Sequence, residues 1–236
     1  AGGVCYFLWE KDSSGPCEVI NVHKGNSVST LRALNEFKTF VRHSEAVPII
    51  RKVLAYDEKM MSEQVSASKP FGLRTYVRPS KSGDIVLRWQ NGEGPFERAE
   101  VTAGLDMIDT WKTITSYVGY DHAGNPGKDG KRRIFAKIDI MPPGTICTET
   151  YLVIGSYPDE TQARNLVAYM KTKFFRFLVA QFMYSHHITK ESYAFVPVLD
   201  MSVRWDDRAL YERYGLTEDE IAFIESKIKP MESNGA

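Results

Sequence analysis

Residues 145–184 constrain the fold most, because they combine a strand pattern, a turn and an extended helical repeat. Residues 148–154 are rich in β-branched and aromatic side chains, which predicts a strand that ends at Gly155. Asp159, followed three residues later by Gln162, predicts a capping box at the start of a helix. The segment therefore predicts a strand, a turn and a helix in that order.

Residues 163–178 repeat apolar side chains every three or four positions, which places these side chains on one face of a helix. They are Ala163, Leu166, Val167, Met170, Phe174, Phe177 and Leu178. The basic residues of the segment fall mostly off that face and are Arg164, Lys171, Lys173 and Arg176. We expect one long core helix whose basic residues are solvated.

The first part of the chain predicts a hairpin followed by helices. Residues 4–9 and 17–22 have the composition of strands and are separated by turn-forming residues, which predicts a β-hairpin. Apolar spacing over residues 31–43 and 44–54 predicts two helices with a break between them. A short third helix is expected over residues 57–65.

The rest of the chain alternates short strands with helices. Strand-like runs occupy residues 73–77, 84–89, 96–101, 134–141 and 192–199, and residues 111–117 fit either a strand or a helix. A helix is expected over residues 205–214, and Thr217 with Glu220 predicts a capping box for the last helix. The prediction is an α+β fold with mixed, mostly antiparallel sheets flanked by helices and preceded by a β-hairpin.

Charge and cysteine content narrow the class of protein. Lys plus Arg number 30 and Asp plus Glu also number 30, so any affinity for nucleic acid must come from local clusters. Cys5, Cys17 and Cys147 lack the spacing of a zinc site, and their odd number favours a reducing compartment. No apolar run approaches the roughly 20 residues of a membrane-spanning helix. We expect a cytoplasmic protein without a structural metal or a membrane partner.

The first basic segment lies between residues 69 and 88. It contains Lys69, Arg74, Arg78, Lys81 and Arg88. Asp84 is its single acid, so the local balance is five minus one, or plus four. Such clusters bind DNA phosphates, and Arg can also donate two hydrogen bonds to a guanine edge. The segment predicts a DNA contact, with a solvated sheet face as the alternative.

A second basic segment follows at residues 119–137, where Gly, Asn and Pro predict an irregular loop. Its basic residues are Lys128, Lys131, Arg132, Arg133 and Lys137. Asp121 and Asp129 oppose them, so five minus two leaves plus three. Tyr120, His122 and Asn125 could reach base edges from such a loop. An ordinary mobile surface loop is the competing interpretation.

Two further features have plainer interpretations. His186 and His187 are adjacent, which is poor geometry for two metal ligands on one face, so we expect surface or half-buried histidines. From Asp200 onward nine acids oppose five bases, a balance of minus four. We expect that end of the chain to face away from DNA.

Several segments together resemble a known family. They read TETYLVIG at 148–155, YMKTKFFRFL at 169–178, FVPVLD at 195–200 and LYERYGLTEDEIAFIESKI at 210–228, with GGVCYFLWEKD at 2–12 and KPFGLR at 69–74. In this order they resemble the C-terminal part of adenine-specific DNA methyltransferases of bacterial restriction-modification systems. That part is the TaqI-like specificity domain, which reads the DNA target.

The resemblance implies a division of labour within a longer enzyme. Residues 1–25 would be the terminal hairpin of the catalytic methyltransferase domain, and residues 26–236 the DNA target recognition domain. The partners would be double-stranded DNA and the catalytic domain of the same parent chain, which binds S-adenosylmethionine. In the parent enzyme Tyr6 or Phe7 could stack on the extruded adenine. Two core aromatics of a strand are the alternative.

Catalytic motifs are missing from the sequence. It has neither a Gly-rich loop for S-adenosylmethionine nor the polar-Pro-Pro-aromatic segment that holds a flipped adenine, and residues 141–144 supply only the paired prolines. We therefore expect no catalytic residue and no cofactor in this chain by itself. Two alternatives to duplex recognition stay open: a protein interaction module that docks a partner subunit, and binding of single strands by stacking on Tyr and Phe.

Overall fold

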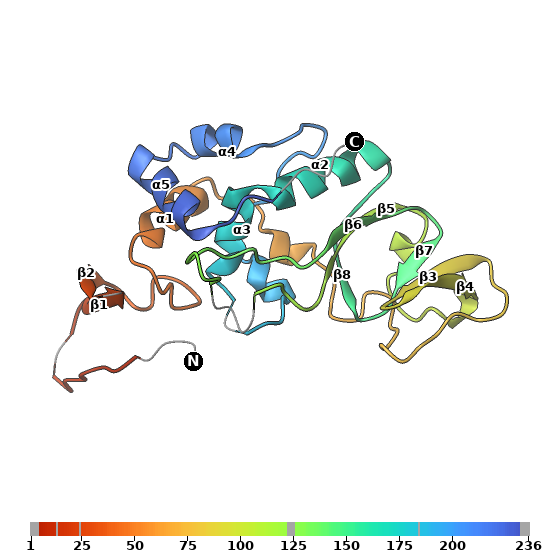
Figure 1. Ribbon diagram of the computed structural model, residues 1–236, viewed down its shortest axis with the longest axis horizontal. Helices are drawn as coiled ribbons and strands as arrows, with labels where there is room; N and C mark the ends of the chain where they lie inside the picture. The colour runs from red at the N-terminus through yellow and green to blue at the C-terminus, as the bar shows by residue number, and fades with distance from the viewer. Residues whose placement is uncertain (1–4, 13, 24, 122–125, 184, 232–236) are drawn as a thin grey trace.

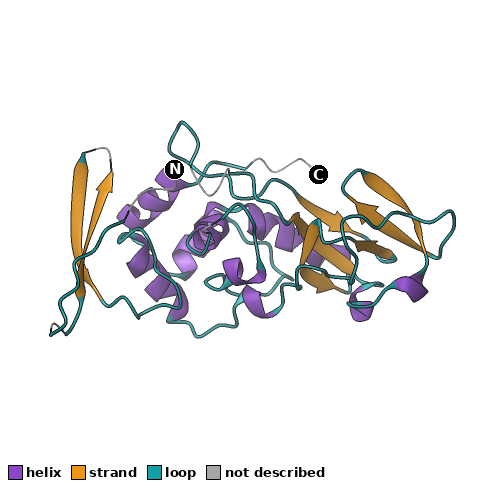
Figure 2. Cartoon of the chain, turned by 90° about the horizontal axis from the view of Figure 1, so that it is seen from below, coloured by secondary structure: helices purple, strands orange, loops and turns teal. Residues whose placement is uncertain are grey.

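The protein is described by a computed structural model that covers residues 5–12, 14–23, 25–121, 126–183 and 185–231 (Figure 1). The molecule is elongated. A two-stranded hairpin lies at one end, a helical body in the middle, and small sheets at the other end (Figure 2). The predicted α+β class is confirmed, since five α-helices combine with one hairpin and two three-stranded sheets in the described residues.

The N-terminal hairpin lies one strand later than predicted. Strands β1 (Cys17–His23) and β2 (Asn26–Arg32) pair antiparallel, whereas residues 5–9 form no strand. Gly25 has a φ of +83°, which suits the tight turn between them. The predicted helix over residues 31–43 is therefore wrong. Its first residues, Leu31 and Arg32, belong to β2, and the rest form turns and bends. The predicted domain division at residue 25 falls in the hairpin turn.

The helical body contains α1 (Ala46–Leu54), α2 (Glu160–Lys171), α3 (Lys173–Ala180), α4 (Asp207–Arg213) and α5 (Glu218–Lys227). Local signals explain most of these helices. The Asp159 side chain accepts a hydrogen bond from the Gln162 amide, and Thr217 and Glu220 form the predicted capping box. Apolar faces of all five helices meet in one core. Among the described residues, no helix is long and apolar enough to cross a membrane.

The predicted single long helix is broken at Thr172. This residue has extended backbone angles, and its hydroxyl accepts a hydrogen bond from the Phe175 amide at 3.1 Å. The Asp207 carboxylate accepts from the Lys173 and Phe174 amides at 3.0 and 2.9 Å. These oxygens satisfy the first N–H groups of α3, where a negative charge also meets the positive end of the helix dipole. The break is thus stabilised from α4.

Arg176 is buried rather than solvated, which corrects the expectation for this basic residue. Its guanidinium donates to the Lys171 carbonyl at 3.0 and 3.2 Å and to the Thr172 carbonyl at 3.1 Å. These are carbonyls at the C-terminal end of α2, which have no partner within the helix. Burial lowers the pKa of Arg176 to about 10. The buried Arg176 cation therefore caps the C-terminal end of α2.

Two small sheets form the other end of the molecule. In the first, β5 (Trp111–Ser116) pairs antiparallel with β6 (Ile138–Met141) and β8 (Tyr151–Tyr157). In the second, β3 (Ile85–Trp89) pairs antiparallel with β4 (Gly92–Phe96) and parallel with β7 (Thr145–Cys147). The sheets are therefore antiparallel and mixed.

Strand predictions held only in part. Strand β8 continues past Gly155, where an added Cβ would lie 2.6 Å from Leu166 of α2, so glycine permits the helix to approach the sheet. The predicted strand over residues 134–141 exists only in its second half. Residues 73–77 and 192–199 contain no strand; the latter include the 3₁₀ turn Lys190–Tyr193 and one bridge at Pro197. The predicted strand 96–101 is wrong beyond Phe96, where β4 ends and a 3₁₀ turn follows.

A second buried cation, Lys112, lies in strand β5. The Lys112 ammonium donates to the carbonyls of Met107, Ile108 and Thr110 at 2.9, 2.8 and 2.7 Å. Three donors meet three acceptors, so this buried group is satisfied. Burial lowers the pKa of Lys112 to about 8. The lysine fixes the 3₁₀ turn that precedes β5.

Candidate nucleic-acid interface

The two predicted basic segments are joined through the short connection at residues 148–150. The Glu149 amide donates to the Leu73 carbonyl at 2.9 Å, and the Glu149 carboxylate accepts from the Thr75 amide at 3.1 Å. On the other side, the Tyr117 amide donates to the Thr150 carbonyl at 2.9 Å. The first segment and the residues just before the second segment therefore both contact residues 148–150.

Asp121 anchors the base of the second segment. Its carboxylate accepts from the Arg133 and Ile134 amides at 3.0 and 2.8 Å. Ile134 is buried and has a φ of +73°, a conformation that is costly for a β-branched residue. The two hydrogen bonds help to hold this strained backbone. Strain of this kind clusters at functional sites, so it supports a functional hypothesis for the loop.

The same segment also contacts the C-terminal end of α5. The Arg132 amide donates to the Lys227 carbonyl at 2.8 Å, and the Lys229 amide donates to the Arg132 carbonyl at 2.9 Å. The Lys229 ammonium lies 3.2 Å from the Asp129 carboxylate. The described part of the loop is therefore tied to the body rather than independent of it. Contrary to the expected separation, residues 227–229 of the acidic end lie beside the basic loop.

The predicted DNA-contacting residues differ in exposure. The exposed ones are Arg74, Arg78, Lys81, Tyr120, Lys128 and Lys137, and the half-buried ones include Lys69, Lys131 and Arg133. His122 and Asn125 lie outside the described residues. None of these roles is tested by the structure, so all of them stay predictions.

Arg88 and Arg132 are held by internal partners. Both side chains are only 15% exposed. Arg88 pairs with Glu93 and lies 3.0 Å from Asp139, while Arg132 donates to the Ala180 carbonyl at 3.2 Å. Burial lowers the pKa of Arg132, and the nearby Asp121 carboxylate opposes this effect. The side chains of these two arginines bind groups within the protein. The exposed lysine and arginine side chains are therefore the better candidates for phosphate contacts.

Aromatic side chains contact some of the basic residues. The Arg133 guanidinium lies 4.5 Å from the centre of the Tyr120 ring, and that of Arg78 lies 4.2 Å from the Trp89 ring. Such contacts hold an arginine side chain in place, and Arg78 also donates to the Thr75 and Val77 carbonyls at 2.6 and 3.0 Å. Tyr76, next to these residues in the first segment, is strongly exposed. The surface thus alternates cations and aromatic rings.

Sequence analysis missed one part of this surface. The rings of Tyr117 and His187 stack with centroids 4.8 Å apart, and the rings of His187 and His186 lie 4.1 Å apart. His186 is exposed and His187 half-buried, as expected from their adjacency. Their position beside residues 117–120 has no local sequence signal, because it depends on contacts between segments almost 70 residues apart.

Tyr6 and Phe7 lie far from any core, with 92% and 86% of their surface exposed. The alternative interpretation as core aromatics of a strand is therefore wrong for this chain. The role suggested for them in base stacking stays a prediction, since it concerns a larger enzyme.

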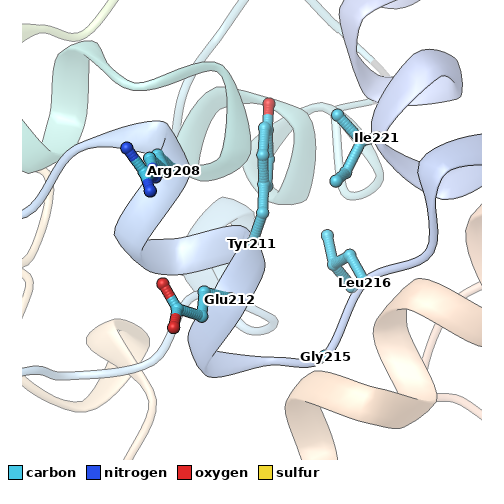
Figure 3. A pocket seen from close by; sticks show the side chains of 6 residues that line it. All are labelled: Arg208, Tyr211, Glu212, Gly215, Leu216 and Ile221. Carbon is cyan, nitrogen blue, oxygen red and sulfur yellow. The ribbon is translucent and has the colours of Figure 1, made fainter.

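A shallow pocket lies between α4 and α5, with a volume of about 380 Å³ (Figure 3). Leu216 and Ile221 lie on one side of the Tyr211 ring, and Arg208 and Glu212 on the other. The Tyr211 hydroxyl donates to the Glu225 carboxylate at 3.1 Å. Within the described parts of the chain, no group of three or more His, Cys, Asp or Glu side chains is placed to hold a metal ion.

Comparisons with models of protein families, with curated proteins and with solved structures found no match for this chain.

Proposed function

We propose that this chain recognises a target sequence in double-stranded DNA on behalf of an adenine-specific DNA methyltransferase of a restriction-modification system. One observation carries the proposal: residues 148–150 contact both the first basic segment and the residues just before the second, and each segment contains an arginine that contacts an aromatic ring. The resemblance of the ordered segments described above supports the same function.

The surface supplies the two kinds of contact that DNA recognition needs. Exposed lysines and arginines neutralise phosphates with release of counterions, which provides affinity without sequence preference. Arginine, tyrosine and histidine side chains between them can donate hydrogen bonds to base edges, which provides specificity. Arg74 and Arg78 from the first segment and Arg133 from the second are candidates for both roles.

The N-terminal arm, defined as residues 5–32, supports the proposed link to a catalytic domain. Its exposed apolar side chains are Tyr6, Phe7, Leu8, Trp9, Ile20, Val22, Val28 and Leu31. An isolated two-stranded hairpin is marginally stable in water, and apolar surface of this kind usually marks an interface. In our proposal the arm packs on the catalytic domain, which binds S-adenosylmethionine and methylates the extruded adenine. Tyr6 and Phe7 would then lie near that base.

The same arm favours a second candidate function, a protein interaction module that docks a partner subunit. In that case the basic surface would be incidental. A pull-down with nuclease treatment separates the two, because a protein partner stays bound after the DNA has been digested.

The first test is selection from a randomised duplex DNA pool by the 236-residue chain, at low and then moderate salt. An enriched motif is the expected result. In a second step, Arg74, Arg78 and Lys81 are exchanged together for Ala. If each contacts one phosphate, the slope of log affinity against log salt becomes less negative by roughly three times 0.9.

The matched control is Arg164→Ala on α2, an exposed arginine paired with Glu160 outside the basic surface. This variant should bind DNA as the unchanged chain does. Equal slopes for the triple variant and the control would remove the first basic segment from the interface. Absence of duplex binding at low salt would instead favour the protein interaction function.

A further inference from the structure

The loops 117–120 and 185–188 form one rigid tip on the basic surface. The Gly119 amide donates to the His186 carbonyl at 2.7 Å, and the Ile188 amide donates to the Tyr117 carbonyl at 2.9 Å. Val118 and His187 form an antiparallel bridge between these bonds. Two segments from distant parts of the chain are therefore paired as a short ribbon, which fixes the backbone of both histidines.

Gly119 permits this close approach. A Cβ at this position would lie 3.0 Å from the Ile134 carbonyl oxygen and 3.3 Å from that of His186. Both neighbours are backbone atoms, which cannot move aside as the end of a side chain can. The tip is also connected at this point to the strained Ile134 and, through it, to Asp121. The ribbon therefore belongs to the same anchored unit as the second basic segment.

Stacking orders the side chains of the tip. The half-buried Tyr117 ring stacks on His187, and His187 contacts the ring of His186. His186 is the exposed end of this series. Its ring is thus held over a rigid base, so that little conformational entropy is lost when the ring contacts a ligand. Tyr120 and Arg133, which contact each other, lie next to the ribbon through the hydrogen bond of the Tyr120 amide with the Ile134 carbonyl.

The chemistry of this tip suits a base edge better than a phosphate. A neutral imidazole has one donor and one acceptor, so it can distinguish the different donor and acceptor patterns of base pairs in the major groove. The tip itself contains no lysine or arginine, whereas the surrounding lysines and arginines can bind the phosphates of the DNA backbone. We infer that His186 is a specificity-determining residue that contacts a base edge, and this inference rests on the proposed recognition of double-stranded DNA.

The test compares His186→Ala and His186→Gln in the full 236-residue chain. Binding is measured to a duplex that carries the motif selected by the unchanged chain and to a duplex of scrambled sequence. We expect His186→Ala to weaken binding to the motif by roughly 10- to 100-fold, the range for loss of one good base contact, with scrambled binding and the salt slope unchanged. Gln keeps a donor and an acceptor and should restore part of the preference.

His43→Ala is the matched control, because His43 is an exposed histidine that contacts Phe223 of α5 outside the tip. This variant should keep the preference for the motif. Thermal unfolding of all variants shows whether the fold is intact.

The outcomes separate the inference from the function on which it rests. Equal losses on the motif and on scrambled duplex, or an unchanged preference in His186→Ala, overturn the role of His186 and leave DNA recognition standing. If the unchanged chain binds all duplexes equally, neither His186 nor another residue of this chain determines specificity. If it binds no duplex at low salt, both the inference and the proposed function fail.

Discussion

The N-terminal arm leaves large apolar side chains exposed, whereas the body that follows it buries its apolar side chains and also two cations. In the arm, Trp9, Ile20 and Leu31 expose most of their surface. Ile20, Val22 and Leu31 lie on one face of the hairpin, because Ile20 is opposite Ser29 and Leu31 is opposite Glu18. No described side chain covers these residues enough to bury them.

In the body, by contrast, the Arg176 and Lys112 side chains are fully buried. Both cations donate to carbonyl groups at the ends of helical segments instead of pairing directly with an acid. Carbonyl groups at helix ends can lack a full set of donors within the helix, and a carbonyl without a donor is costly to bury. The buried charges are therefore part of the hydrogen bonding of the core.

The comparison shows that the arm, unlike the body, has apolar surface that no other part of the described chain buries. The body has apolar burial and hydrogen bonds within itself. The arm keeps surface whose burial would contribute about 1.5–3 kcal/mol for each large apolar side chain. That free energy is available to association, which is why the arm fits the proposed docking on a catalytic domain or another protein. Substitutions can test both halves of this comparison.

The largest effect is expected from Arg176→Met. This change keeps most of the side-chain volume but removes the guanidinium hydrogen bonds to the Lys171 and Thr172 carbonyls. We expect the free energy of unfolding to fall by about 3 kcal/mol. Urea denaturation measures it, and Arg164→Met, at an exposed position of α2, should change it by less than about 0.5 kcal/mol. Similar values for both variants would show that the buried cation contributes nothing to the core.

A smaller effect is expected from the titration of Lys112. Burial lowers its pKa in the folded chain to about 8, below the ordinary value of 10.5. Between these values the unfolded chain binds the proton more tightly, so this group makes the free energy of unfolding rise with pH. The rise should reach about 2 kcal/mol between pH 8 and 10, since one pKa unit corresponds to about 1.4 kcal/mol.

The measurement is urea denaturation at several pH values, compared with Lys112→Met. This variant lacks the titrating group and is less stable because three carbonyls lose the hydrogen bond from the ammonium group. Buried groups whose pKa is raised by burial, such as Tyr193 and Cys147, act in the opposite direction as their unfolded-state groups titrate, and they do so in both proteins. A parallel pH dependence in the two proteins would exclude Lys112 as the cause.

Local signals in the sequence predicted those parts of the fold that are stabilised locally. The capping box of Thr217 and Glu220 placed the start of α5, and the strand-like run at residues 84–89 placed β3. The break at Thr172 was missed because Asp207, more than 30 residues away, caps α3. The burial of Arg176 was missed for a similar reason, since a basic residue off the apolar face normally indicates solvent.

In the candidate site, too, some features have a local sequence signal and others depend on contacts between distant segments. The two basic segments were visible in the sequence because charge clustering is a local property. That residues 148–150 join them, and that His186 lies beside Gly119, follows from backbone hydrogen bonds between distant segments. The hairpin was displaced by one strand because Leu31 and Leu34 have helical spacing, although Leu31 belongs to β2.

The smallest effect is expected in the arm, from Ile20→Thr, with Ile50→Thr in the body as its comparison. Both changes exchange the same β-branched side chain, but Ile20 is 57% exposed and Ile50 is fully buried in α1. Ile50→Thr should lower the free energy of unfolding by about 2–4 kcal/mol, because a hydroxyl enters a packed core. Ile20→Thr should change it by less than about 0.5 kcal/mol in the chain alone. If Ile20→Thr proved as costly as Ile50→Thr, the hairpin face would already be buried, and the arm would have no apolar surface left for a partner.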